Sequence, residues 1–187
     1  MRVRYLMTDL AITTAASYLA TTAMERFSMK LYELEAPADR DREDAARPGP
    51  PDRIAAQKST ELLGLHLDDA ALGKASLVFH YGLAASWAPL YPLLRRATSL
   101  GPVPAGLLTG ASMSLLVDEG LTPLLGFSAP NRAYPLATHA RGVAAHLVFG
   151  MAVAAVTETA WALLRRPPPH ATAEPPGHHS THAPSHR

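Results

Sequence analysis

Four long stretches of this chain carry almost no charge, and they limit the folds open to it more than any other feature. They run from Tyr5 to Met24, Ala75 to Leu94, Gly101 to Val117 and Gly142 to Leu164. A helix needs about 20 mainly apolar residues to cross a bilayer core of about 30 Å. The second and fourth stretches meet this length, the first contains Asp9, and the third needs its extension GLTPLLG. The pattern predicts transmembrane helices at about residues 5–25, 75–94, 101–121 and 142–164.

The fold class that we expect is all-α, an integral membrane bundle of four transmembrane helices within residues 1–166. Residues 30–73 should form a polar first loop, because APADRDREDAARPGPPDR mixes charges and prolines and cannot build a core. Within that loop, Ile54 to Leu65 is mildly amphipathic, which fits a short helix on the membrane surface or an exposed helix in water. Residues 167–187 are rich in Pro, His and Ser, and we expect a disordered tail.

Two other interpretations of the apolar stretches stay open. One is a soluble bundle of buried helices, although 187 residues offer little polar helix surface to wrap four apolar helices. The other is a signal peptide, because Arg2 and Arg4 resemble its basic start. Asp9 and the many threonines that follow would give such a peptide a poor apolar centre.

Composition and motifs exclude several functional classes. The formal net charge of +1 argues against nucleic acid as the main partner. The chain has no cysteine, so it has neither disulfides nor a thiolate for metal binding or catalysis. HExxH, GxSxG and phosphate-binding glycine motifs are absent from the sequence. We therefore expect a protein that is not an enzyme and that carries no cofactor.

Basic residues near the ends of the stretches predict the orientation in the membrane. The short third loop carries only Arg132 and, at its edge, Arg141. The N-terminus, the second loop and the end of the fourth stretch are richer, with Arg2, Arg4, Arg95, Arg96, Arg165 and Arg166. We expect both termini to lie in the cytoplasm.

Small and polar residues recur every four positions along the stretches, which places them on one face of each helix. Such faces pack together in lipid, because small side chains allow close approach and polar ones form interhelical hydrogen bonds. The expected packing positions are Gly106, Gly110, Gly142 and Gly150. The GxxxG pattern from Gly106 to Gly110 also offers a face for a homo-oligomer.

Ionisable residues on these faces are the candidates for activity, since a charge at the bilayer centre costs about 2.5 to 3.5 kcal/mol even on insertion scales. Their depth predicts an outer polar layer and a thinner inner layer, which contains Asp9 and Glu158 with arginines as partners. Ordinary interhelical hydrogen bonding is the simplest role for both layers. The intramembrane candidates are Glu25, His80, Asp118, Glu119, His146 and Glu158.

The outer layer also has a composition that can bind a divalent metal, with His80, His146 and Asp118 as the candidate ligands. A haem held by His80 and His146 is a remote alternative, because the nearby carboxylates would make a poor apolar pocket. Histidines in the tail can bind metals as well, although a solvated end is the simpler interpretation; they are His170, His178, His179, His182 and His186.

The order of these features resembles a loose family of bacterial inner-membrane proteins of unknown function, the YagU-type proteins. The similarity covers about Leu10 to Arg166. It implies a small multi-pass helical protein and assigns no catalytic residue. The features that carry it are a small-residue first helix ending in Met24 and Glu25, a loop with Pro48, Pro50 and Pro51, the HYG at His80, the GLTP at Gly120, and the AHLVFG at Ala145.

From the sequence we expect a multi-pass protein of the bacterial inner (plasma) membrane with a structural or envelope-homeostasis role. The alternative is a small carrier or channel for protons or a divalent metal ion. A water-filled crevice joining the two polar layers would favour the carrier. A dry, tightly packed seam would favour the structural role.

Overall fold

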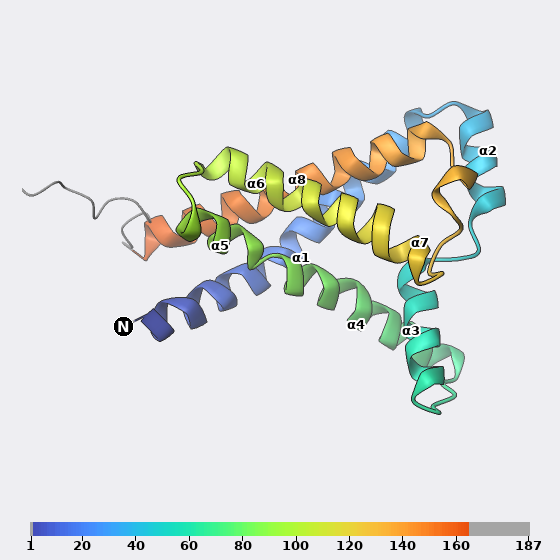
Figure 1. Cartoon of the computed structure of the whole chain (residues 1–187), viewed down its shortest axis with the longest axis horizontal. Coiled ribbons are helices and arrows are strands. Elements are labelled where there is room, and N and C mark those ends of the chain that lie inside the picture. Colours follow the sequence, from blue (N-terminus) through green and yellow to red (C-terminus); the bar gives the residue numbers. More distant parts are fainter. Residues whose placement is uncertain (1, 165–187) are drawn as a thin grey trace, which may run out of the picture.

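The computed structural model describes residues 2–164, which form helices joined by short connections and contain no strand. This confirms the all-α class. The long helices run along the molecule, and the short helices α2, α3 and α7 gather at one end (Figure 1). In chain order the elements are α1 (Arg2–Leu34), α2 (Pro37–Ala46), α3 (Pro51–Leu62), α4 (Asp69–Trp87), α5 (Leu90–Ala97), α6 (Pro102–Met113), the π-helix η1 (Ser114–Leu121), α7 (Thr122–Leu124), the 3-10 helix η2 (Asn131–Ala133) and α8 (Leu136–Leu163).

Helix α8 is the centre of the bundle. It packs along α1 on one side and along α6 on the other, α4 lies against α1, and α3 lies against α4. Among the described residues, α8 is the one helix long and apolar enough to cross a membrane. By itself such a helix indicates membrane association only weakly, because the core helix of a soluble protein meets the same test.

Prolines divide and start these helices, as their geometry requires. The second apolar stretch breaks into α4 and α5 around Pro89, because proline lacks the backbone N–H that would continue the helix. Pro102 occupies the first turn of α6, where its missing N–H costs nothing. The third stretch, predicted as a helix over residues 101–121, is continuous from α6 through η1 to α7. It ends after Leu124, before Gly126 turns the chain with φ of +67°.

The prediction of a polar loop over residues 30–73 is wrong for most of its length. Helix α1 continues to Leu34, and α2 and α3 fill much of the remainder. The mixed charges of this segment do not build an apolar core, but they make ion pairs that hold α2 against α8. The short helix expected near Ile54 to Leu65 is present as α3. The tail predicted to be disordered, residues 167–187, lies outside the described residues, as do Arg165 and Arg166.

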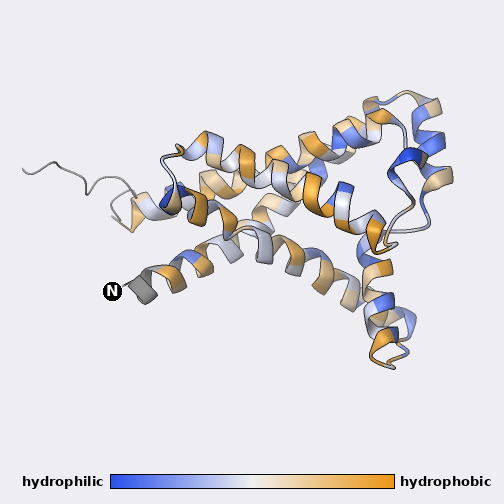
Figure 2. Ribbon diagram, in the orientation of Figure 1, coloured by the Kyte–Doolittle hydropathy of each residue, from blue (hydrophilic) through white to orange (hydrophobic). Residues whose placement is uncertain are grey.

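The interior of the bundle is built from small and polar side chains, whereas many large apolar side chains lie on its surface. Alanines such as Ala20, Ala84 and Ala105 form much of the apolar core, around Tyr91 and Phe149. Figure 2 shows apolar residues spread over the outer faces of the long helices. The buried polar side chains include Asp9, Thr13, Ser17, Thr21, Thr109, Ser114, His146 and Thr157.

The close contact between α6 and α8 depends on glycine. A Cβ at Gly110 would lie 2.0 Å from the carbonyl oxygen of His146, and one at Gly150 would lie 2.1 Å from that of Gly106. Both distances are far inside van der Waals contact, so only glycine allows the two backbones to approach this closely. Gly142 takes no part, because a Cβ there would meet nothing within 4 Å.

The glycine contact also decides what the GxxxG face can bind. Gly106 and Gly110 are buried against α8 of the same chain. A second copy cannot reach them while α8 is in place. These two glycines are therefore used within the chain, and a homo-oligomer stays a prediction.

Candidate functional site

The inner polar layer contains two separate networks. The first is centred on Asp9 of α1, which is 3 % exposed. Its carboxylate accepts a hydrogen bond from the indole N–H of Trp161, with 2.9 Å between Nε1 and Oδ1. Arg96 of α5 faces the same group, with 2.6 Å between Nη2 and Oδ2. Asp9 thus joins α1 to both α5 and α8.

The second inner network is centred on Glu158 of α8. Its Oε1 accepts hydrogen bonds from the Tyr91 hydroxyl at 2.7 Å and from Nε of Arg95 at 2.8 Å. Arg95 also donates to the carbonyl oxygen of Leu100 at 2.6 Å. Both hydrogen bonds go to Oε1, and the arginine balances the charge of the carboxylate. This network ties α5 to α8.

The outer polar layer divides into three pairs of one histidine with one carboxylate. Glu25 of α1 meets His80 of α4, with 2.8 Å between Oε1 and Nε2. Asp118 of η1 lies 3.4 Å from Nδ1 of His146, which also contacts the carbonyl oxygen of Gly142 at 2.9 Å.

The third pair uses a histidine that the sequence analysis missed. Glu119 of η1 meets Nδ1 of His139 at 2.8 Å, and the other ring nitrogen lies 3.1 Å from the carbonyl oxygen of Asn131. His139 and His146 are seven positions apart on α8 and therefore share one face. That spacing was the signal available in the sequence.

The π-helical turn η1 explains how two adjacent carboxylates both face α8. A π-helix is wider than an α-helix, because each N–H bonds five residues back. Neighbouring side chains then point in more similar directions, and Asp118 and Glu119 reach His146 and His139 on the same helix. Turns of this kind are frequent at functional sites.

The predicted metal ligands do not come together. His80, His146 and Asp118 were the candidates. His146 does lie beside Asp118, but His80 of α4 pairs with Glu25 of α1 instead. Within residues 2–164, no three side chains of the types His, Asp and Glu lie close enough to hold a metal ion. The two imidazoles expected for a haem each have a carboxylate partner instead.

A buried ion cluster outside both layers is the main feature that the sequence analysis missed. Arg141, at the start of α8, faces Glu43 of α2 at 2.6 Å and Glu35 at 2.6 Å. Glu43 is fully buried and also accepts hydrogen bonds from Thr138, at 2.7 Å, and from Arg47. The sequence analysis placed Glu35 and Glu43 in a polar loop that builds no core. That expectation failed because Arg141, the partner of Glu43, lies 98 positions further along the chain.

Further contacts fasten α2 to its surroundings. The hydroxyl of Tyr32, in the last turns of α1, donates to Asp44 of α2 at 3.0 Å. Arg42 donates to the carbonyl oxygens of Arg132 and Ala133. Helix α2 is thus a cap bonded to the ends of α1 and α8.

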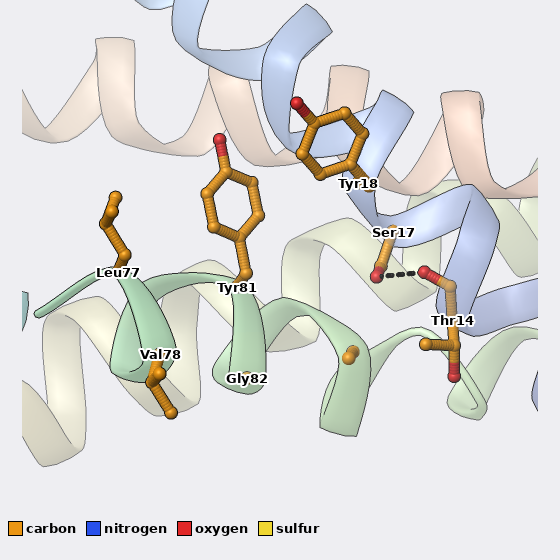
Figure 3. Close-up of a pocket in the computed structure, with 8 residues that line it drawn as sticks. Thr14, Ser17, Tyr18, Leu77, Val78, Tyr81 and Gly82 are labelled. Carbon is orange, nitrogen blue, oxygen red and sulfur yellow. Dashed lines mark hydrogen bonds between the residues drawn. The ribbon is translucent and has the colours of Figure 1, made fainter. Parts of the chain in front are cut away.

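An open groove of about 490 Å³ runs between α1 and α4. Figure 3 shows its walls, with the rings of Tyr18 and Tyr81 side by side above a bare helix surface at Gly82. The ring centroids are 5.1 Å apart in a stacked arrangement. Ser17 turns its hydroxyl to the carbonyl oxygen of Thr14, at 2.8 Å, and so offers little polarity to the groove.

The packed interior thus contains paired ionisable groups at both ends and hydroxyls between them. Comparison with protein-family models, with curated proteins and with solved structures gave no match. What the chain does must be argued from its own residues.

Proposed function

We propose that the chain is a four-span protein of the bacterial inner membrane with a structural, non-enzymatic role. The spans would be α1, α4 with α5, the continuous helix from α6 to α7, and α8. The observation that carries the proposal is the inverted distribution of side chains, with hydroxyls, carboxylates and alanines inside and leucines outside.

The inversion is pronounced on the helices that flank α8. On α1, Leu19 is 56 % exposed while Thr13 and Thr21 are buried. On α4, Leu77 and Val78 are 57 % and 70 % exposed. A soluble protein rarely presents contiguous apolar surface over several helices, whereas a lipid-facing surface requires it.

The same arrangement accounts for the modest hydropathy of α1. Its inward face carries Asp9, Thr13 and Ser17, which lower the average over the whole helix. Helices in lipid associate through small residues and interhelical hydrogen bonds, because apolar burial offers no advantage over contact with lipid tails. The glycine contact between α6 and α8 is packing of this type.

The paired state of the ionisable groups favours a structural role over catalysis. Asp9, Glu158, Glu25, Asp118 and Glu119 each have a partner on another helix. Each pair joins two elements that are distant in sequence and fixes their relative position. In this proposal the polar layers act as fasteners of the bundle.

The proposed topology follows from the same four spans. An even number places both termini on one side, and the arginines beside the spans favour the cytoplasm for that side. Helices α2 and α3, with the turn around Gly126, would then lie on the outer side. The resemblance to the YagU-type proteins agrees with this arrangement and remains a prediction.

Extraction of membranes tests the proposal. A protein with four spans should stay in the membrane pellet when membranes are washed at alkaline pH with carbonate, and should enter solution only with detergent. Release by carbonate alone would refute the spans and leave a soluble helical bundle with an exposed apolar surface.

A second candidate function is a small carrier or channel for protons or a divalent metal ion. One observation favours it: the hydroxyl oxygens of Thr21, Ser114 and Thr157 are buried without a hydrogen-bond partner in the described structure. They come from α1, η1 and α8 and lie between the two polar layers along the chain. Buried hydroxyls of this kind attract water or an ion.

Flux measurements separate the two functions. Vesicles that contain the purified protein and a pH-sensitive dye should show no more proton leak than empty vesicles if the role is structural. A protein-dependent leak that is lost in Thr21→Val, with the bundle still folded, would favour the carrier.

A further inference from the structure

The connection between α3 and α4 presents a row of exposed leucines. It reads LLGLHL over residues 62–67, which we name the leucine loop. Leu62 is 88 % exposed, Leu63 75 %, Leu65 51 % and Leu67 37 %. A soluble loop normally keeps such side chains out of water, so this surface indicates an apolar partner.

The leucine loop has a fixed place at the outer end of the proposed bundle. Helix α3 lies across the end of α4 instead of running along the bundle (Figure 1). Asp52 of α3 accepts a hydrogen bond from Ser76 of α4, and Arg53 pairs with Asp69. These contacts hold the loop beside the first turns of α4.

The depth of the loop agrees with the headgroup layer of a bilayer. The apolar part of α4 starts near residue 75, six positions after the helix begins at Asp69. At 1.5 Å per residue the start of an upright α4 would lie about 9 Å beyond the hydrocarbon core, just outside a headgroup layer about 5 to 8 Å thick. A tilt of about 40°, at the upper end for membrane helices, brings the helix start to about 7 Å, which lies within that layer.

The charges near the loop suit a lipid surface. Three carboxylates neighbour the loop, those of Glu61, Asp68 and Asp69, and each has a hydrogen-bonding partner. Lys74 is exposed on α4 near the start of its apolar part, where an ammonium group can meet lipid phosphates. The cations Arg53, Lys58 and Lys74 balance the three carboxylates, so a zwitterionic lipid surface would not be repelled.

Exposed apolar side chains appear again on α4, where Leu77 and Val78 lie beyond the exposed Asp69 and Lys74. Apolar side chains on both sides of a few charged ones suit the boundary between hydrocarbon and headgroups. A protein partner seated on the loop would have to displace lipid from the proposed lipid-facing side of α4, which favours lipid as the occupant.

We propose that the leucine loop inserts into the outer headgroup layer, where its leucines contact the upper parts of lipid acyl chains. The inference rests on the proposed four-span arrangement. It makes α3 and the loop a monotopic anchor that fixes the depth and tilt of α4. Loss of the anchor would leave the spans in place.

The absence of cysteine allows a direct test with single labels. A nitroxide is attached to Leu63→Cys, to Leu19→Cys on the exposed face of α1, and to Asp41→Cys on the exposed side of α2, each in the full chain. The proteins are placed in vesicles of phosphatidylcholine and phosphatidylglycerol. Collision rates of each label with oxygen, which enters lipid, and with a nickel chelate, which stays in water, are then measured.

We expect the label at position 63 to meet oxygen more often than the nickel chelate, at a depth between those of positions 19 and 41. A label at 63 that behaves like the one at 41 would overturn the anchor, because the loop would lie in water. Protection from both reagents would also overturn it, since protein would then cover the loop. If the label at 19 meets the nickel chelate freely, the spans themselves are wrong, which distinguishes the two failures. Leu65→Cys repeats the measurement.

Discussion

Replacing Gly150 by alanine tests the backbone contact between α6 and α8. The new Cβ would lie 2.1 Å from the carbonyl oxygen of Gly106 and 2.6 Å from the amide nitrogen of Gly110. Ordinary contact for a Cβ begins at 3.4 Å, so the helices would have to separate by about 1.3 Å. Because the atoms in the way belong to the backbone, no side-chain rotation can relieve the clash.

Two opposing effects set the size of the change. Overpacking of a tight contact typically costs about 1 to 3 kcal/mol. Alanine favours the helix over glycine by about 0.8 to 1.0 kcal/mol, which offsets part of that cost. The immovable backbone puts the overpacking cost at the upper end. We expect Gly150→Ala to lower the free energy of unfolding by about 2 kcal/mol.

Gly142→Ala is the matched control, because it lies on the same helix and its Cβ would meet nothing within 4 Å. It should leave stability unchanged or raise it by up to about 1 kcal/mol. Both variants are unfolded in mixed micelles by increasing the fraction of dodecyl sulfate, with helix content and tryptophan fluorescence as signals. Equal unfolding midpoints for the two variants would refute the close contact.

The remaining predictions concern the ion pairs and use the same unfolding assay. Arg141→Gln removes the cation that Glu35 and Glu43 share, and it should cost about 3 kcal/mol, the lower end for a broken buried pair, because Arg47 stays beside Glu43. Lys30→Gln breaks an exposed pair and should cost less than about 1 kcal/mol; equal losses would contradict the buried cluster. Glu158→Gln removes the negative charge that faces the nearly buried Arg95, and it should lower the free energy of unfolding by about 2 to 5 kcal/mol. An unchanged unfolding midpoint would exclude this ion pair. Trp161→Phe keeps an aromatic ring but removes the indole N–H that donates to the Asp9 carboxylate. The free energy of unfolding should fall by about 1 to 3 kcal/mol. No change would mean that this hydrogen bond does not contribute to stability.

The sequence predicts those parts of the fold that depend on local pattern. The break near Pro89 follows from proline geometry, and the pairing of Asp9 and Glu158 with Arg96 and Arg95 follows from their depth along apolar helices. Spacing by four also brings out the face of α6 that contacts α8. The break and the face of α6 depend on residues within one or two helical turns, whereas the ion pairs follow from the similar depth of residues on different helices.

Other parts could not be predicted, because they depend on contacts between distant segments. Glu43 is buried only because Arg141 meets it, and neither residue carries a local sign of the other. Nothing in SLLVDEGL marks a π-helix, so the separate partners of Asp118 and Glu119 were not foreseen. The outer layer was expected as one cluster, and the folded chain divides it into pairs.

Hydropathy alone does not identify all four proposed spans. Helix α8 meets the criterion for a membrane helix in length and hydropathy, although its buried face includes Arg141, His146 and Thr157. Helix α1 has an inward face of threonine, serine and Asp9, which lowers its average although its outward face is apolar. Spacing by four predicts this inward face, and its polar side chains are buried in the fold, which supports the four-span proposal.

The side of the membrane on which each connection lies tests the central claim most directly. Single cysteines at Ser99, in the turn before α6, and at Arg132, in the turn before α8, are treated with a membrane-impermeant maleimide in intact and in lysed cells. The four-span arrangement predicts that Cys at 132 reacts in intact cells and that Cys at 99 reacts only after lysis. Equal reaction of both sites in intact cells would show that the helix from α6 to α7 does not cross the membrane, and would contradict the account.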